Sequence, residues 1–153
     1  MKFISKNLKD TAQIAANFAS SLKDAHQGAT IIGLYGELGS GKTTFIKYLA
    51  ENFGVKETIQ SPTFVIMKSF HLSTCPTLSF RRVFPSFNKL IHIDAYRIEK
   101  PEEMLNLGWR EIISDPQNLI CIEWPERIAK IMPEHIMVKF EHVSENERKI
   151  SVA

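Results

Sequence analysis

Apolar residues recur at helical spacing in three stretches of the chain. These stretches are 8–22, 43–52 and 101–113, and each predicts a helix with one buried face. The third opens with a proline and two glutamates, which suit the first turn of a helix. Gly28 and Gly54 follow the first two stretches, where glycine favours the end of a helix. We therefore expect three helices.

Between the helical stretches lie short runs that are almost entirely apolar. They occupy 29–35, 89–94 and 118–123, and two of them end on an acidic residue. Runs of this kind are typical of strands that are covered on both faces of a parallel sheet. Strands that alternate with helices predict an α/β fold in three layers, with a mostly parallel central sheet.

The remaining segments are less regular. Residues 61–70 are rich in β-branched and aromatic residues, which favours an extended conformation. Residues 71–88 contain two prolines and several Ser and Thr residues, which indicates a long connection or an inserted hairpin. A short helix is expected at 125–132, followed by a closing hairpin formed by 135–143 and 148–153.

Composition limits the class of protein. The 153 residues are 44% hydrophobic and 24% charged, which suits a single globular domain over 1–153. A net charge of +2 is too small to indicate strong nucleic-acid binding. Cys75 and Cys121 form no paired motif, as expected in a reducing compartment. With no signal peptide or membrane-spanning run, we expect a cytoplasmic protein without a membrane partner.

The stretch GELGSGKTT follows the first predicted strand and opens the next predicted helix. Gly36, Gly41, Lys42 and Thr43 fit the phosphate-binding pattern GxxxxGK[ST]. In this pattern the glycines let backbone N–H groups turn toward phosphate oxygens, and the helix start adds its positive dipole end. We expect Lys42 to reach the β- and γ-phosphates and the Thr43 hydroxyl to bind Mg²⁺. The alternative, a glycine-rich surface turn, fits the flanking strand and helix less well.

Two acids are candidates for the same site, because each ends a predicted strand and ligands bind beyond the carboxyl ends of parallel strands. Asp94 could hold Mg²⁺ directly or through water, or it could cap the following turn. Glu123 could bind Mg²⁺ or position the attacking water, or it could stabilise the start of the next helix. Trp124 could cover the nucleotide or belong to the core.

Two weaker candidates lie between the acids and the glycine loop. Thr63 could sense the γ-phosphate, although Ser-Pro-Thr is also an ordinary turn. Arg81 and Arg82 could grip phosphate or a partner, or they could lie on a solvated loop.

The motifs together resemble one family, TsaE, formerly named YjeE, the P-loop ATPase of bacterial tRNA threonylcarbamoyladenosine (t6A) biosynthesis. The resemblance runs from about Thr30 to Arg127. It is carried by five segments in this order: YGELGSGKTTF, SPTF, IHIDAYRIE, PEEMLNLGWREI and CIEWPER. The SPTF and IEWPER segments are the specific ones, because generic P-loop proteins lack them.

The resemblance implies a P-loop NTPase fold and an ATPase that uses ATP and Mg²⁺. It also implies association with the TsaB–TsaD heterodimer, in which TsaD transfers the threonylcarbamoyl group to an adenosine beside the tRNA anticodon. The tRNA would then be a partner only through that complex, and the chain would not be the transferase.

The site residues implied by the resemblance cover the phosphates, the metal and the base. Thr43 and Glu123 would bind Mg²⁺, Asp94 would order the metal or its water, and Lys42 would act on the phosphates. Thr63 would lie on the γ-phosphate side, Trp124 close to the nucleotide, and Thr11 near the base. The residues expected to hold the phosphates are Gly36, Glu37, Leu38, Gly39, Ser40, Gly41, Lys42, Thr43 and Thr44.

One departure from the family and three rival functions remain. The 28 residues between Thr63 and His92 exceed the short hairpin expected of the family, and the surplus falls within 71–88. A small-molecule kinase would use this insert as a lid, with Arg81 or Arg82 as a clamp. A GTPase is less compatible, since the NKxD and DxxG motifs are missing. A module that binds ATP without hydrolysing it is the third rival.

Overall fold

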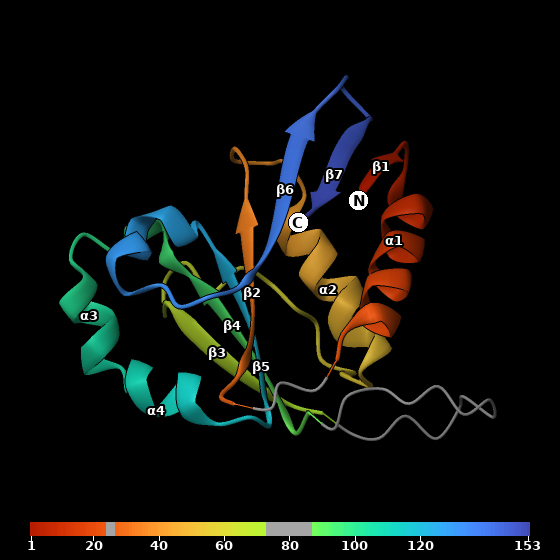
Figure 1. Cartoon of the computed structure of the whole chain (residues 1–153). Coiled ribbons are helices and arrows are strands. Elements are labelled where there is room, and N and C mark those ends of the chain that lie inside the picture. Colours follow the sequence, from red (N-terminus) through yellow and green to blue (C-terminus); the bar gives the residue numbers. More distant parts are fainter. Residues whose placement is uncertain (24–26, 73–86) are drawn as a thin grey trace.

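A seven-stranded sheet forms the centre of the protein in the computed structural model, which describes residues 1–23, 27–72 and 87–153 (Figure 1). The strand order across the sheet is β1-β7-β6-β2-β5-β4-β3. The strands are β1 (Lys2–Ser5), β2 (Thr30–Tyr35), β3 (Met67–His71), β4 (Lys89–Asp94), β5 (Asn118–Glu123), β6 (Ile136–His142) and β7 (Arg148–Val152).

The middle of the sheet is parallel and its edges are antiparallel. Strand β2 pairs in parallel with β5 and β6, and β4 pairs in parallel with β5. Strand β3 lies antiparallel to β4 at one edge, and β7 lies antiparallel to both β6 and β1 at the other. In the β4–β5 register Asp94 stands opposite Glu123, so the two strand-end acids are neighbours. This confirms the predicted fold class.

Helices α1 (Leu8–Ser21) and α2 (Lys42–Asn52) lie side by side on one face of the sheet (Figure 1). The side chain of Asn7 accepts a hydrogen bond from the Asp10 N–H and caps α1. Phe45 and Leu49 of α2 are fully buried against this face of the sheet. The core on this side therefore fixes α2 directly beyond the end of β2.

Helices α3 (Pro101–Asn106) and α4 (Trp109–Ser114) cover the opposite face, together with the short 3₁₀ segments η1 (Ala95–Arg97) and η2 (Pro125–Ile131). Trp109 is buried here, and its indole N–H donates to the Ile131 carbonyl. Along β4 the side chains alternate between the two cores: Leu90 belongs to the α1–α2 side, and Ile91 to the α3–α4 side. The sheet is thus the middle of three layers.

Several local expectations need correction. The helix expected over 101–113 is two helices, because Gly108 adopts a φ of +80° between them. Only the last part of 61–70 is a strand, and the expectation for 71–88 lies largely outside the described residues. Strand β1 was not predicted at all.

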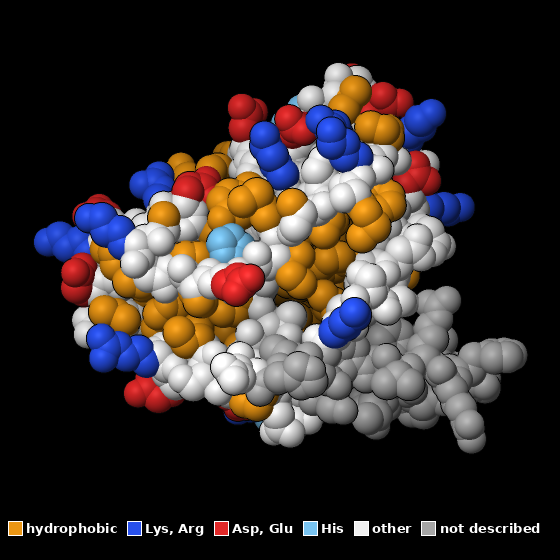
Figure 2. All heavy atoms as spheres, viewed as in Figure 1, with side chains coloured by type: hydrophobic (Ala, Val, Ile, Leu, Met, Phe, Trp, Pro, Cys, Tyr) orange, Lys and Arg blue, Asp and Glu red, His pale blue; other side chains and the backbone are white. Residues whose placement is uncertain are grey.

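The surface of the face drawn in Figure 2 is chemically mixed. On the face viewed in Figure 2, Lys and Arg side chains alternate with Asp and Glu side chains around an apolar area. Within the described residues, no helix is long and apolar enough to cross a membrane.

Candidate functional site

The glycine loop spans the gap between β2 and α2 and takes conformations that favour glycine. Gly36, Gly39 and Gly41 have φ values of +144°, +74° and +100°. At Gly36 space is also short, since a Cβ atom would lie 2.6 Å from the Phe140 carbonyl oxygen. Gly41 is the N-cap of α2, and its carbonyl accepts the first helical hydrogen bond from Phe45. The loop therefore delivers the positive end of α2 to the carboxyl edge of the sheet.

Lys42 folds back over this loop. Its Nζ donates to the carbonyl oxygens of Gly36 and Glu37, at 2.7 and 2.9 Å, and lies 4.1 Å from the centre of the Trp124 ring. Burial lowers the pKa of Lys42 below its ordinary value, while the nearby carboxylate of Glu123 opposes the shift. A partly desolvated ammonium group held beside backbone carbonyls is well suited to exchange those carbonyls for phosphate oxygens.

Thr43 and Glu123 are directly joined. The Thr43 hydroxyl donates to Glu123 Oε1 over 2.7 Å, and His92 Nε2 lies 2.8 Å from the same oxygen. Both Glu123 and His92 are buried, at 4% and 0% exposure. Because Thr43 donates its only hydrogen to the carboxylate, the lone pairs of its oxygen remain for a cation.

Asp94 accepts hydrogen bonds from the loop that follows α2. Its Oδ2 accepts hydrogen bonds from the Ser61 and Thr63 hydroxyls, the latter at 2.6 Å, and its Oδ1 accepts from the Tyr96 N–H. Asp94 therefore does cap the following turn, which was the structural alternative for this residue. The same carboxylate also ties Thr63 to the strand that carries the site.

A cavity of about 330 Å³ lies over these groups. It is lined by Leu38, Gly39, Ser40, Gly41, Lys42, Thr43, Thr44, Ser61, Thr63, Asp94, Tyr96, Glu123 and Trp124. Trp124 is in a left-handed backbone conformation, with a φ of +59°, at the point where β5 ends. Its ring lies 5.2 Å from that of Tyr96, and Lys42 Nζ lies over the Trp124 ring.

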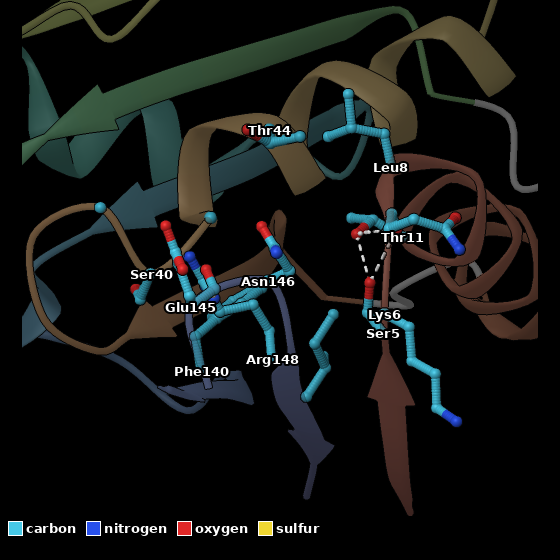
Figure 3. Close-up of a pocket in the computed structure, with 14 residues that line it drawn as sticks. Ser5, Lys6, Leu8, Thr11, Ser40, Thr44, Phe140, Glu145, Asn146 and Arg148 are labelled. Carbon is cyan, nitrogen blue, oxygen red and sulfur yellow. Dashed lines mark hydrogen bonds between the residues drawn. The ribbon is translucent and has the colours of Figure 1, made fainter. Parts of the chain in front are cut away.

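A second cavity, of about 530 Å³, lies on the other side of the loop (Figure 3). Figure 3 shows Leu8 and Thr11 of α1 on one wall, with Ser40 and Thr44 from the loop and α2 nearby. Thr11 shares a 2.7 Å hydrogen bond with Ser5, whose hydroxyl it faces across the start of α1.

Arg148, on β7, lines this second cavity and stabilises the turn beside it. Its Nη1 donates to the carbonyl oxygens of Ser144, Glu145 and Glu147, each at 3.0 Å, and so braces the turn between β6 and β7. The two cavities share Gly39, Ser40, Gly41 and Thr44. They therefore lie next to each other on either side of the glycine loop, and the pair is called the recess below.

Most residues selected from the sequence meet at this recess. Gly36 and Glu37 are different, because they line neither cavity and act instead through their carbonyl groups on Lys42. Arg81 and Arg82 lie outside the described residues. Sequence reasoning did not select Tyr96 or His92 for the site.

A signal for His92 was present in the sequence. In a strand, residues two apart point to the same face, so His92 had to share a face with Asp94. A histidine that is completely buried inside an apolar strand needs a polar partner. Tyr96 had no comparable signal, because the turn after Asp94 decides where its ring lies.

The donor set indicates how a metal ion could bind. No group of three or more His, Cys, Asp or Glu side chains able to hold a metal ion occurs in the described part of the chain. Mg²⁺ usually takes one or two protein oxygens together with substrate phosphates and water. The Thr43 hydroxyl beside the Glu123 carboxylate fits that mode of binding, in which the nucleotide brings the ion.

The chain is similar to proteins of one known family. The family model described as "Threonylcarbamoyl adenosine biosynthesis protein TsaE" matches residues 5–150. The tRNA threonylcarbamoyladenosine biosynthesis protein TsaE of Treponema pallidum is 29% identical over 154 residues, which cover 100% of each chain. The protein of the same name from Rickettsia typhi is 36% identical over 146 residues, covering 94% of this chain and 88% of its own.

A solved structure also shares the fold. The crystal structure of YdiB from Bacillus subtilis has a TM-score of 0.72 and 26% identity to this chain. The match covers 99% of this chain and 83% of YdiB.

Proposed function

The chain belongs to the TsaE family, and from that premise we propose that it binds and hydrolyses ATP in the biosynthesis of t6A in tRNA. In this proposal it acts with the TsaB–TsaD heterodimer, supports threonylcarbamoyl transfer without performing it, and meets tRNA only through that complex. The cavity of about 330 Å³ is called the phosphate-side cavity below. The observation that carries the proposal is that Lys42, Thr43 and Glu123 all line it, with Thr43 hydrogen-bonded to Glu123.

ATP binding is supported by the shape of the recess. A nucleoside triphosphate needs an anion site for its phosphates and an adjoining space for its base and sugar. The loop supplies the first, through its glycine-rich backbone, the start of α2 and the Lys42 ammonium group. The adjoining cavity beside Thr11 is large enough for a nucleoside, since its volume of about 530 Å³ lies well within the range of ordinary ligand sites.

Hydrolysis is supported by the carboxylate that faces the phosphate side. Mg²⁺, when bound with the nucleotide, would neutralise charge that develops on the phosphate oxygens. Thr43 would hold the ion through its oxygen while it donates its hydrogen to Glu123. Glu123 would orient a water or metal ligand, and Asp94 would keep the Thr63 hydroxyl at the edge of the same cavity.

Dependence on a partner is supported by what the phosphate-side cavity lacks. None of the described arginines lines it. Arg97 lies 4.5 Å from the Phe64 ring, and Arg127 lies 5.7 Å from the Tyr96 ring. An arginine that reaches the transition state accelerates related reactions by about 10³–10⁵-fold. We therefore expect weak hydrolysis by the chain alone.

The test is phosphate release from ATP with Mg²⁺, measured for the chain alone and with TsaB–TsaD. We expect slow release alone and faster release with the heterodimer. Lys42→Ala, tested in parallel, should abolish the stimulated release. Release that ignores TsaB–TsaD but requires a small hydroxyl acceptor would contradict the proposal and favour the kinase alternative. No release under any condition would leave only an ATP-binding module.

A further inference from the structure

His92 lies behind the proposed metal-binding acid. It sits on β4, two residues before Asp94, and is opposite Cys121 in the parallel register with β5. Glu123 is two residues beyond Cys121 on β5, so its side chain leaves the sheet on the same face as His92. The two side chains bridge the strands diagonally, with His92 Nε2 2.8 Å from Glu123 Oε1.

The hydrogen on this imidazole can be placed by counting partners. An ionised carboxylate only accepts hydrogen bonds, so Nε2 must carry the hydrogen that joins it to Glu123. The other ring nitrogen, Nδ1, is buried and has no partner among the described residues. A bare lone pair at Nδ1 is therefore the less costly arrangement, since a buried N–H group without an acceptor is rare.

Both hydrogen bonds to the carboxylate end on one oxygen. Thr43 and His92 each donate to Oε1, at 2.7 and 2.8 Å. This leaves Oε2 without a hydrogen bond from the described residues, while Glu123 lines the phosphate-side cavity. Two donors, one from α2 and one from β4, hold Oε1 in place and restrict rotation of the carboxylate more than a single donor would.

We propose that His92 is a positioning residue that holds the Glu123 carboxylate in the orientation needed to engage Mg²⁺ with ATP. The proposal rests on the function proposed above for Glu123. His92 itself is fully buried and lines neither cavity, so it acts through Glu123 and not by contact with the nucleotide. Partners that orient a metal-binding side chain typically contribute about 10–100-fold to metal affinity or activity.

The experiment separates the hydrogen bond from simple packing. His92→Leu removes the donor and keeps an apolar side chain in the core. His92→Gln places an amide N–H near the position of Nε2, whereas the shorter His92→Asn places one near Nδ1. The probe is a fluorescent ATP analogue, whose binding is titrated in EDTA and then against increasing Mg²⁺.

We expect His92→Leu to raise the Mg²⁺ concentration for half-maximal binding by about tenfold or more, in line with other residues that orient metal-binding groups. Binding in EDTA and the midpoint of thermal unfolding should change little. His92→Gln should restore most of the Mg²⁺ response and His92→Asn should not. In a Glu123→Gln background, His92→Leu should have no additional effect.

An unchanged Mg²⁺ response in His92→Leu would overturn the proposal, as would equal loss of binding with and without Mg²⁺. Equal behaviour of the Gln and Asn variants would also overturn it, because packing alone would then explain the effect. Wild-type binding that ignores Mg²⁺ refutes this proposal and the metal role of Glu123 together. Wild-type binding that needs Mg²⁺ without any phosphate release refutes hydrolysis alone.

Discussion

Replacement of Lys42 by methionine would test whether this side chain serves the ligand or the fold. The substitution keeps most of the apolar stem and removes the ammonium group. In the structure that group donates to the Gly36 and Glu37 carbonyl oxygens and lies over the Trp124 ring. All of these contacts are made within the protein, so the effects of the substitution on stability and on ATP affinity can be worked out separately.

The effect on stability should be small. Two hydrogen bonds from a charged donor would each contribute about 1.5–3 kcal/mol, but burial of the ammonium group offsets them, as the lowered pKa of Lys42 indicates. Gly36 and Glu37 are partly or fully exposed, so water can replace the lost donor. We expect a net change below about 1 kcal/mol, or about 2–4 °C in the unfolding midpoint of a chain of this size.

The effect on ATP affinity should be larger. Charge-assisted bonds to the phosphates would contribute about 1.5–3 kcal/mol each, and binding first requires loss of the two carbonyl bonds. The net loss in Lys42→Met is then of the order of one such bond. This corresponds to ATP binding that is about 10–100-fold weaker.

Calorimetric titration with ATP and Mg²⁺ measures the affinity, and scanning calorimetry measures the unfolding midpoint. Lys47→Met is the matched control, since Lys47 lies on the same helix and lines neither cavity. ATP affinity of Lys42→Met within about threefold of wild type would refute the assignment of the loop as the phosphate site. Loss of folding would instead show that the carbonyl contacts hold the loop together.

Three further variants address the acid, the core and a helix cap. Glu123→Ala is expected to retain ATP binding at saturating Mg²⁺ and lose phosphate release, because a group that orients a metal or water matters most in the transition state. Normal release would assign Glu123 to the start of η2 alone. Trp109→Ala should lower the free energy of unfolding in urea by about 3–5 kcal/mol, and a smaller loss would show that the α3–α4 layer is loosely packed. The pKa of Glu103 lies below its ordinary value of 4.5, because backbone N–H groups at the start of α3 donate to it. The contribution of Glu103 to stability is therefore complete above the ordinary pKa of 4.5 and is lost as pH falls through the lowered pKa. Wild type and Glu103→Gln should differ in unfolding free energy at pH 7 and converge in acid.

The parts of the site that could be predicted are those fixed by local chemistry. Strands β4 and β5 occupy the expected 89–94 and 118–123, because continuous apolar runs between polar segments have few other stable conformations. The glycine loop was equally clear, since its glycines adopt the positive φ values that the pattern requires. Asp94 and Glu123 then had to lie near it, because parallel strands end at one edge.

The parts that could not be predicted depend on partners distant in the sequence. Strand β1 has only four residues, two of them apolar, and exists because its backbone pairs with β7. The bond between His92 and Glu123 needs β4 and β5 to be neighbours, which the order of strands along the chain does not specify. The break at Gly108 was readable in principle, but glycine is also tolerated within helices.

The alternation of side chains across the sheet has a practical consequence for protein engineering. On β4, Leu90 faces the same core as α1 and α2, and Ile91 and Ile93 face the core with Trp109. Apolar substitutions on the Trp109 side can thus be used to adjust thermal stability with the hydrogen bonds of His92 left in place. Substitutions at Leu90 share a face with those bonds, so a gain in stability there puts nucleotide chemistry at risk.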